Sequence, residues 1–151
     1  MAAGTRRHLP DSLLPRGKVM NCSDICIDVP DYDEGNVFYR EAFHIARKSY
    51  RCCECHDPIE IGMTYQYTAG KSEGKLWTMK TCAVCCDIRR ALICGSWVFG
   101  ELWDEIYDYI FPAWEKFSPI DCIAKIESLR ARSVILTKYS EWQHSKFLKK
   151  R

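Results

Sequence analysis

The chain has 151 residues, a formal net charge of +2 and a hydrophobic fraction of 47%. These values are typical of one folded domain with a helical extension, and they exclude wholesale disorder. A net charge this small does not identify a partner by itself.

Ten cysteines are many for this length. Residues 1–17 lack the apolar run of a secretory signal, and no stretch approaches the roughly 20 apolar residues that span a bilayer. We therefore expect a cytoplasmic protein without a membrane partner, in which reduced thiols are available to bind a metal.

The first elements are irregular or extended. Residues 1–20 show no periodic pattern and predict a mobile tail. Residues 37–48 are ambiguous between helix and strand. A strand is favoured because Val37, Tyr39, Phe43 and Ile45 would share one face.

A β-hairpin and a helix are expected next. Apolar and polar residues alternate over residues 63–68, residues 76–81 predict a second strand, and residues 69–74 would form the loop between them. A helix is then expected to run from Thr81, as its N-cap, to Leu92.

Two further helices complete the expected α+β fold. In residues 101–111, acidic residues fall on one face and four apolar residues on the other, with Pro112 expected to limit the helix; the four are Leu102, Trp103, Ile106 and Ile110. Ser118 and Pro119 are typical of the start of a last helix, with an apolar stripe of Ile123, Ile126 and Leu129. The predicted organisation is a tail over 1–20, a zinc-binding domain with the acidic helix over 21–118, and a basic C-terminal helix over 119–151.

Two C-x-x-C motifs are the strongest functional signal. Cys52 and Cys55 form the first, Cys82 and Cys85 the second. Zinc prefers four tetrahedral ligands, and thiolates are common donors. A tight turn or the first turn of a helix brings cysteines three apart to one point, and a helix N-terminus stabilises thiolate charge. These residues predict one structural zinc ion.

The order of turn, hairpin and helix is that of a treble-clef zinc finger (knuckle, β-hairpin, helix), here extended by two C-terminal helices. His56 follows the first motif where such knuckles usually place Gly, and His tolerates a positive φ better than most residues. Four protein thiolates would close the coordination shell, so the zinc would not be catalytic.

The other cysteines leave alternatives open. Cys53 and Cys86 flank the ligands and could replace them in a shifted register. Cys22 and Cys26, with Cys94 or Cys122, could hold a second ion; otherwise each is a small buried hydrophobe.

Three segments carry a resemblance to a known family: residues 46–55 (ARKSYRCCEC), residues 65–67 (YQY) and residues 80–85 (KTCAVC). They resemble a family of small zinc-binding proteins encoded by bacteriophages and prophages. The family typically has Gly where this chain has His56. The resemblance implies a zinc site and a phage or prophage origin, hence the host bacterial cytoplasm, and it adds no activity.

Catalysis is not expected, because no nucleophile, base and orienting group can be assembled from the four scattered histidines. No small-molecule substrate is expected either.

Recognition of a macromolecule is expected instead. Residues 101–121 hold six acidic residues against Lys116, whereas residues 122–151 hold eight basic residues against two Glu. Such segregation is also typical of ordinary solvated helix faces. Nucleic acid is favoured because cations contact phosphate and nearby aromatics can stack on bases. The candidate residues are Arg130, Arg132, Lys138, Lys146, Lys149, Lys150 and Arg151.

The alternative is a protein that binds and modulates a host enzyme, such as RNA polymerase or a defence nuclease. Its candidate contacts are the aromatic residues in and around the acidic helix, which are equally typical of a core.

Overall fold

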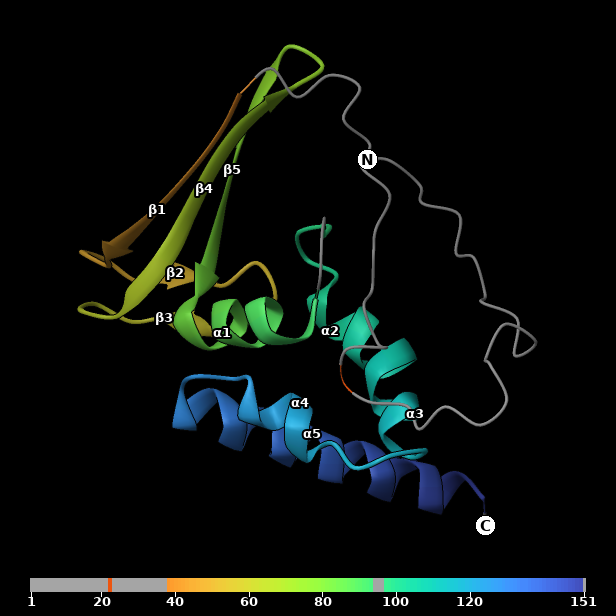
Figure 1. The fold of residues 1–151 in the computed structure, drawn as a ribbon. Coiled ribbons are helices and arrows are strands. Elements are labelled where there is room, and N and C mark those ends of the chain that lie inside the picture. The colour runs from red at the N-terminus through yellow and green to blue at the C-terminus, as the bar shows by residue number, and fades with distance from the viewer. Residues whose placement is uncertain (1–21, 23–37, 94–96, 151) are drawn as a thin grey trace.

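The computed structural model describes Cys22 and residues 38–93 and 97–150 (Figure 1). It shows an α+β arrangement in which a small antiparallel sheet stands on helix α1, and the remaining helices lie beside and below α1 (Figure 1). The predicted tail over residues 1–20 lies outside the described residues.

The larger sheet has three strands in the order β1-β4-β5, with β1 spanning Phe38–Ile45, β4 Thr64–Ser72 and β5 Lys75–Cys82. Both pairings are antiparallel. The strand favoured over residues 37–48 is therefore present, but it ends at Ile45, before the expected end, and Val37 lies outside the described residues.

The hairpin is also confirmed, but its predicted loop over 69–74 is too long. The strands extend through Ser72 and resume at Lys75, so the turn consists of Glu73 and Gly74. Both have positive φ values, 50° and 76°, which suits a two-residue turn between twisted strands. Residues 69–72, which were predicted to lie in the loop, instead form backbone pairs with residues 75–78 of β5.

A second, two-stranded sheet frames the knuckle. Its strands are β2, Tyr50–Arg51, and β3, Pro58–Ile59, paired antiparallel. Six residues separate them along the chain, and the first C-x-x-C motif lies in this connection.

Helix α1 spans Ala83–Leu92 and begins slightly later than expected. Its N-cap is Cys82, whose sulfur accepts the backbone N–H of Cys85, so Thr81 is not the cap. Thr81 instead belongs to β5 and is fully buried.

The acidic helix runs beyond its expected end. It consists of α2, Leu102–Glu105, the π-helical turn η3, Ile106–Ile110, and α3, Phe111–Trp114. In η3 the N–H of Phe111 bonds to the carbonyl of Ile106, five residues back. A π turn is wider than an α turn, and here it accommodates the ring of Pro112, which an α-helix would press against the preceding turn.

The predicted single C-terminal helix is two helices, α4, Ile120–Ala124, and α5, Leu129–Lys149. The side chain of Ser128 accepts the N–H of Ala131 and caps α5. Arg132 donates to the carbonyls of Ala124 and Ile126, which satisfies backbone groups at the break.

The stripe predicted on that helix is only partly correct. Ile126 is buried, but it lies between α4 and α5, whereas Leu129 is 78% exposed. The buried residues of α5 are Ala131 and Ile135.

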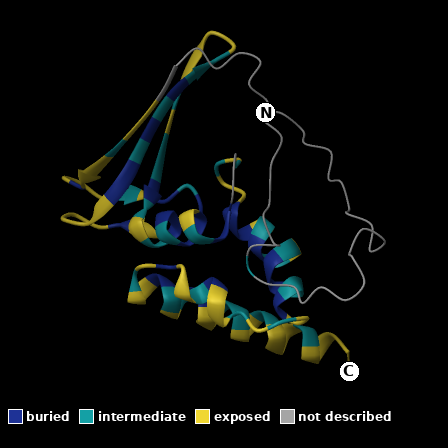
Figure 2. Ribbon diagram, viewed as in Figure 1, coloured by how far each residue is buried: buried dark blue, intermediate teal, exposed yellow. Residues whose placement is uncertain are grey.

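The main core lies between α1, α2–α3 and α5 (Figure 2). All four apolar residues predicted on the acidic helix are buried, which confirms that face: Leu102, Trp103, Ile106 and Ile110. Much of the sheet's outer strand β1 is exposed instead (Figure 2).

Candidate metal centre

The structure brings Cys52, Cys55, Cys82 and Cys85 together in one cluster. Their sulfur atoms all lie within 4.8 Å of one another, and Cys55 Sγ is 3.9 Å from Cys82 Sγ. Four sulfurs bound tetrahedrally to zinc at 2.3 Å would lie about 3.8 Å apart. The donor set and its spacing therefore fit a zinc ion.

The first pair of sulfurs is positioned by the knuckle's backbone. Cys52 N–H donates to Asp57 O at 3.0 Å, and His56 N–H donates to Cys52 O at 3.1 Å. His56 takes a φ of 62°, so His occupies the left-handed position where such knuckles usually place Gly. This left-handed residue reverses the chain, so both cysteine side chains point inward.

The second pair is positioned by the junction between β5 and α1. Cys85 N–H lies 3.5 Å from Cys82 Sγ, and Cys82 N–H lies 3.3 Å from Cys52 Sγ. Cys53 N–H donates to Lys80 O at 2.8 Å, which fastens the knuckle to β5. Backbone donors directed at sulfur stabilise thiolate charge, as metal binding requires.

The four sulfurs also interact strongly with each other. Neighbouring thiols, that of Cys55 first, donate to Cys52 and lower its pKa, while the bonds to Cys52 raise the pKa values of Cys82 and Cys85. Four thiols this close cannot all ionise unless a cation neutralises them. Zinc would supply that charge and hold the knuckle and helix together.

Cys53 and Cys86 lie outside this cluster. Cys53 Sγ is 3.3 Å from Thr81 Oγ1, and Cys86 Sγ is 3.5 Å from Gln66 Oε1. Burial raises the pKa of each thiol to about 11. Both are therefore protonated hydrogen-bonding groups, and the unshifted register of the ligands is the one that the structure favours.

A buried ion pair that the sequence analysis missed ties the knuckle to the rest of the molecule. Glu54, inside the first motif, is 3.4 Å from Arg89 of α1, and their side chains are almost fully buried. The Glu54 carboxylate also accepts the N–H groups of Gly100 and Leu102 at 3.0 and 3.1 Å. Because Glu54 and Arg89 are 35 residues apart, no local pattern could have revealed the pair.

Burial nevertheless dominates the electrostatics of Glu54. Its pKa is raised, chiefly by desolvation, and the two backbone donors and Arg89 offset this only in part. Arg89 has further partners: it donates to Gln66, and its guanidinium lies 4.5 Å from the ring centre of Trp97.

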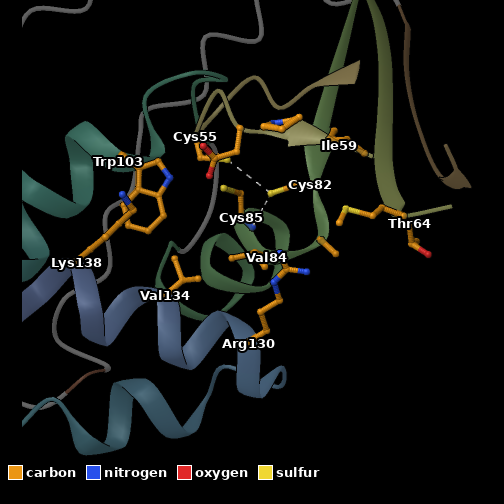
Figure 3. A pocket seen from close by; sticks show the side chains of 14 residues that line it. Cys55, Ile59, Thr64, Cys82, Val84, Cys85, Trp103, Arg130, Val134 and Lys138 are labelled. Carbon is orange, nitrogen blue, oxygen red and sulfur yellow. Dashed lines mark hydrogen bonds between the residues drawn. The ribbon is translucent and has the colours of Figure 1, made fainter. Parts of the chain in front are cut away.

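A cavity of about 240 Å³ adjoins the sulfur cluster (Figure 3). Cys55, Cys82 and Cys85 line one side, and α5 contributes Arg130 and Lys138 to the other (Figure 3). A zinc ion with four thiolates carries a formal charge of −2, which these two cations can partly neutralise.

Trp103 also lines this cavity, and its ring lies 4.8 Å from Lys138 Nζ. The residue is 9% exposed, and its indole N–H has no hydrogen-bond partner among the described residues.

Cys22, a candidate for a second metal site, is bonded to Cys122 in a disulfide that spans 100 residues. Cys122 lies in α4 and is fully buried. The expectation of reduced thiols therefore does not hold for this pair. A sulfur held in a disulfide is not a thiolate ligand, so Cys22 and Cys122 cannot serve the predicted second site in this structure, and Cys26 and Cys94 lie outside the described residues.

The cations proposed for nucleic-acid binding have different environments. Arg132 donates to two backbone carbonyls. Lys146 Nζ lies 2.7 Å from the Glu115 carboxylate and 4.5 Å from the ring centre of Trp142. Arg130 is exposed at the rim of the cavity, where Lys138 is half-buried. Lys149 and Lys150 are exposed, and Arg151 lies outside the described residues.

Comparison with protein-family models, curated proteins and solved structures found no match. The resemblance to phage zinc-binding proteins therefore stays a prediction. In the part of the chain that the structure describes, every helix is too short or too polar to cross a bilayer.

Proposed function

We propose that this chain is a non-catalytic zinc-binding protein of treble-clef type that recognises nucleic acid. The treble-clef assignment is supported by the order of knuckle, hairpin β4–β5 and α1, with one ligand pair in the knuckle and the other at the start of the helix. The sulfur cluster makes these elements one unit.

A structural role for the metal follows from the ligand set. Four thiolates complete the tetrahedral shell of zinc, so no position remains for a water or a substrate. The ion would contribute to folding and would not take part in a reaction.

The observation that supports nucleic acid is the concentration of exposed cations in two places. Arg47, Lys48 and Arg51 are exposed on the chain leading into the knuckle, and Lys149 and Lys150 are exposed at the end of α5. Lysine and arginine contacts to phosphate supply most of the sequence-independent affinity of such proteins.

The proposal is tested by titrating labelled single-stranded and double-stranded DNA and RNA with zinc-loaded protein at about 50 and 200 mM salt. We expect binding that weakens by about tenfold or more at the higher salt. Removing the charges of Lys149 and Lys150 should weaken it further. Absence of binding at the lower salt would refute nucleic-acid recognition.

A specific observation also favours the second candidate, binding to a host protein. Phe43, Ile45 and Ile61 are 53%, 67% and 70% exposed, and Met63 is 37% exposed. The hydrogen bonds between Ala46 and residues 62–63 bring β1's end and this turn together. Adjacent exposed apolar residues are typical of protein interfaces.

This alternative can be tested on bacterial RNA polymerase in a transcription assay with purified components. Inhibition by the intact protein that is lost in an Ile45→Ser, Ile61→Ser double variant would support it. Equal inhibition by both proteins, or none, would count against this surface and this enzyme.

A further inference from the structure

One face of the three-stranded sheet gathers aromatic and basic side chains. The strand register places His44 opposite Tyr65, and Tyr67 opposite both Ala42 and Lys80. Directly opposed residues in a sheet point to the same side, so these side chains share one face. We name this set, with Tyr50 and Lys48 beside it, the tyrosine face.

Helix α1 covers the other side of the sheet. Gln66, which alternates with Tyr65 and Tyr67, bonds to Cys86 and Arg89 of that helix. Because successive residues of a strand point to opposite sides, the tyrosine face is directed away from α1.

The rings of the tyrosine face form a continuous group. The His44 ring centre lies 6.0 Å from that of Tyr65 and 5.7 Å from that of Tyr67, and Tyr50 lies 5.3 Å from Tyr65. Tyr65 is 6% exposed and forms the base of this group. Tyr50 and Tyr67 are half-buried and His44 is exposed, so parts of their rings face solvent.

Cations surround the rings. Lys80 Nζ lies 5.0 Å from the ring centre of Tyr50 and 5.7 Å from that of Tyr67, and Lys48 Nζ lies 5.6 Å from that of Tyr50. Arg40 is exposed in the next row of the same face. The three rows from Arg40 to His44 contain no acidic residue on this face.

We propose that the tyrosine face binds single-stranded nucleic acid, with bases stacked on His44, Tyr50 and Tyr67 and phosphates near Lys48 and Lys80. This inference rests on the proposed function and names the surface that performs it. Aromatic side chains stack on any base whose face is free, and nearby cations attract the backbone. The paired bases of a duplex do not offer their faces, so a single strand fits this surface better.

The experiment measures the affinity of zinc-loaded protein for labelled oligonucleotides of about 12 nucleotides, by fluorescence anisotropy at about 50 and 200 mM salt. Tyr67→Leu removes a ring and keeps apolar bulk, whereas Tyr67→Phe keeps the ring. We expect Tyr67→Leu to weaken single-strand binding by about tenfold and Tyr67→Phe to bind nearly as the parent does. Lys80→Gln should reduce the slope of log affinity against log salt by about 1.

Matched controls lie on the same strands but on the opposite face. Phe43→Leu is the control for His44→Leu, because Phe43 is the neighbouring residue of β1 and is also exposed. Lys75→Gln is the control for Lys80→Gln on β5. Zinc content and melting temperature are measured for each variant, and His44→Leu, at an exposed position of the same face, keeps the test valid if Tyr67→Leu fails to fold.

The outcomes separate the two levels of the proposal. Single-strand binding that falls in the tyrosine-face variants and persists in the controls supports the inference. Binding that is unchanged in those variants, or that is equally strong for a duplex, overturns the inference and leaves nucleic-acid recognition standing. Absence of any binding overturns both. Displacement of the oligonucleotide by polyglutamate at equal charge concentration would overturn the inference in favour of an acidic protein partner.

Discussion

The knuckle half, which holds the four-cysteine cluster, and the helical half of this molecule are stabilised in different ways. Around the knuckle the regular elements are very short, since β2 and β3 have two residues each. Their geometry depends on four sulfurs and on a buried ion pair. The helical half depends on apolar packing, centred on the fully buried Phe111.

Aromatic contacts show how dense that second half is. The ring of Phe111 lies between 5.1 and 5.7 Å, centre to centre, from those of Tyr107, Trp114, Tyr139 and Trp142. A small domain that cannot bury enough apolar surface in one region gains stability there from a metal. We therefore expect loss of the metal to unfold the region around the knuckle, and loss of apolar packing to destabilise the helical half.

The largest expected effect comes from the metal ligands. Cys52→Ser or Cys82→Ser should abolish zinc binding and unfold the knuckle, hairpin and α1 together, because zinc contributes about 10–16 kcal/mol in comparable finger peptides. Zinc content by mass spectrometry and hydrogen exchange of β4 and β5 measure this. Cys53→Ser and Cys86→Ser are the matched controls and should retain zinc. A ligand variant with full metal content and an unchanged melting temperature would refute the assignment.

Apolar packing in the helical half gives the next largest effect. Phe111→Ala should reduce the free energy of unfolding by about 3–5 kcal/mol, because it leaves a large cavity among four rings. Chemical denaturation measures the loss, and zinc content should stay near one ion per chain. Leu136→Ala, at a position 46% exposed on α5, is the control and should cost much less. Loss of zinc in the Phe111 variant would show that the two halves are not separable.

The Glu54 carboxylate joins the two halves, because it pairs with Arg89 of α1 and also accepts the N–H groups of Gly100 and Leu102. Glu54→Gln should reduce the free energy of unfolding by about 1.5–3 kcal/mol, since Arg89 and two backbone donors lose a charged partner. Lys146→Gln breaks the exposed pair with Glu115 and should cost only about 0.2–1 kcal/mol, because solvent screens that pair. Equal costs for the two substitutions, measured by denaturation, would contradict the importance of the buried pair.

The last expected effect is the pH dependence of metal affinity. The pKa values of Cys82 and Cys85 are raised by hydrogen bonds to Cys52, so zinc must displace their protons. Affinity should therefore fall as pH falls, by about tenfold per unit for each proton released, which corresponds to about 1.4 kcal/mol. Competition with a chromophoric chelator between about pH 6 and about pH 8 measures the slope. An affinity independent of pH would contradict binding through thiols.

Several features follow from the sequence alone because their causes are local. The spacing of the four cysteines identified the sulfur cluster, since residues three apart in a turn or at a helix start lie on one side. The apolar spacing from Leu102 to Ile110 identified the buried face of the acidic helix for the same reason.

Other features were decided only by contacts between distant parts of the chain. Glu54 meets Arg89 because β5 and α1 bring the second motif against the knuckle, and neither residue's neighbours indicate this. The break between α4 and α5 depends on Arg132 reaching back to Ala124 and Ile126. The tyrosine face needs the register of three strands, and register is fixed by pairing across the sheet, which the spacing of residues along one strand does not specify.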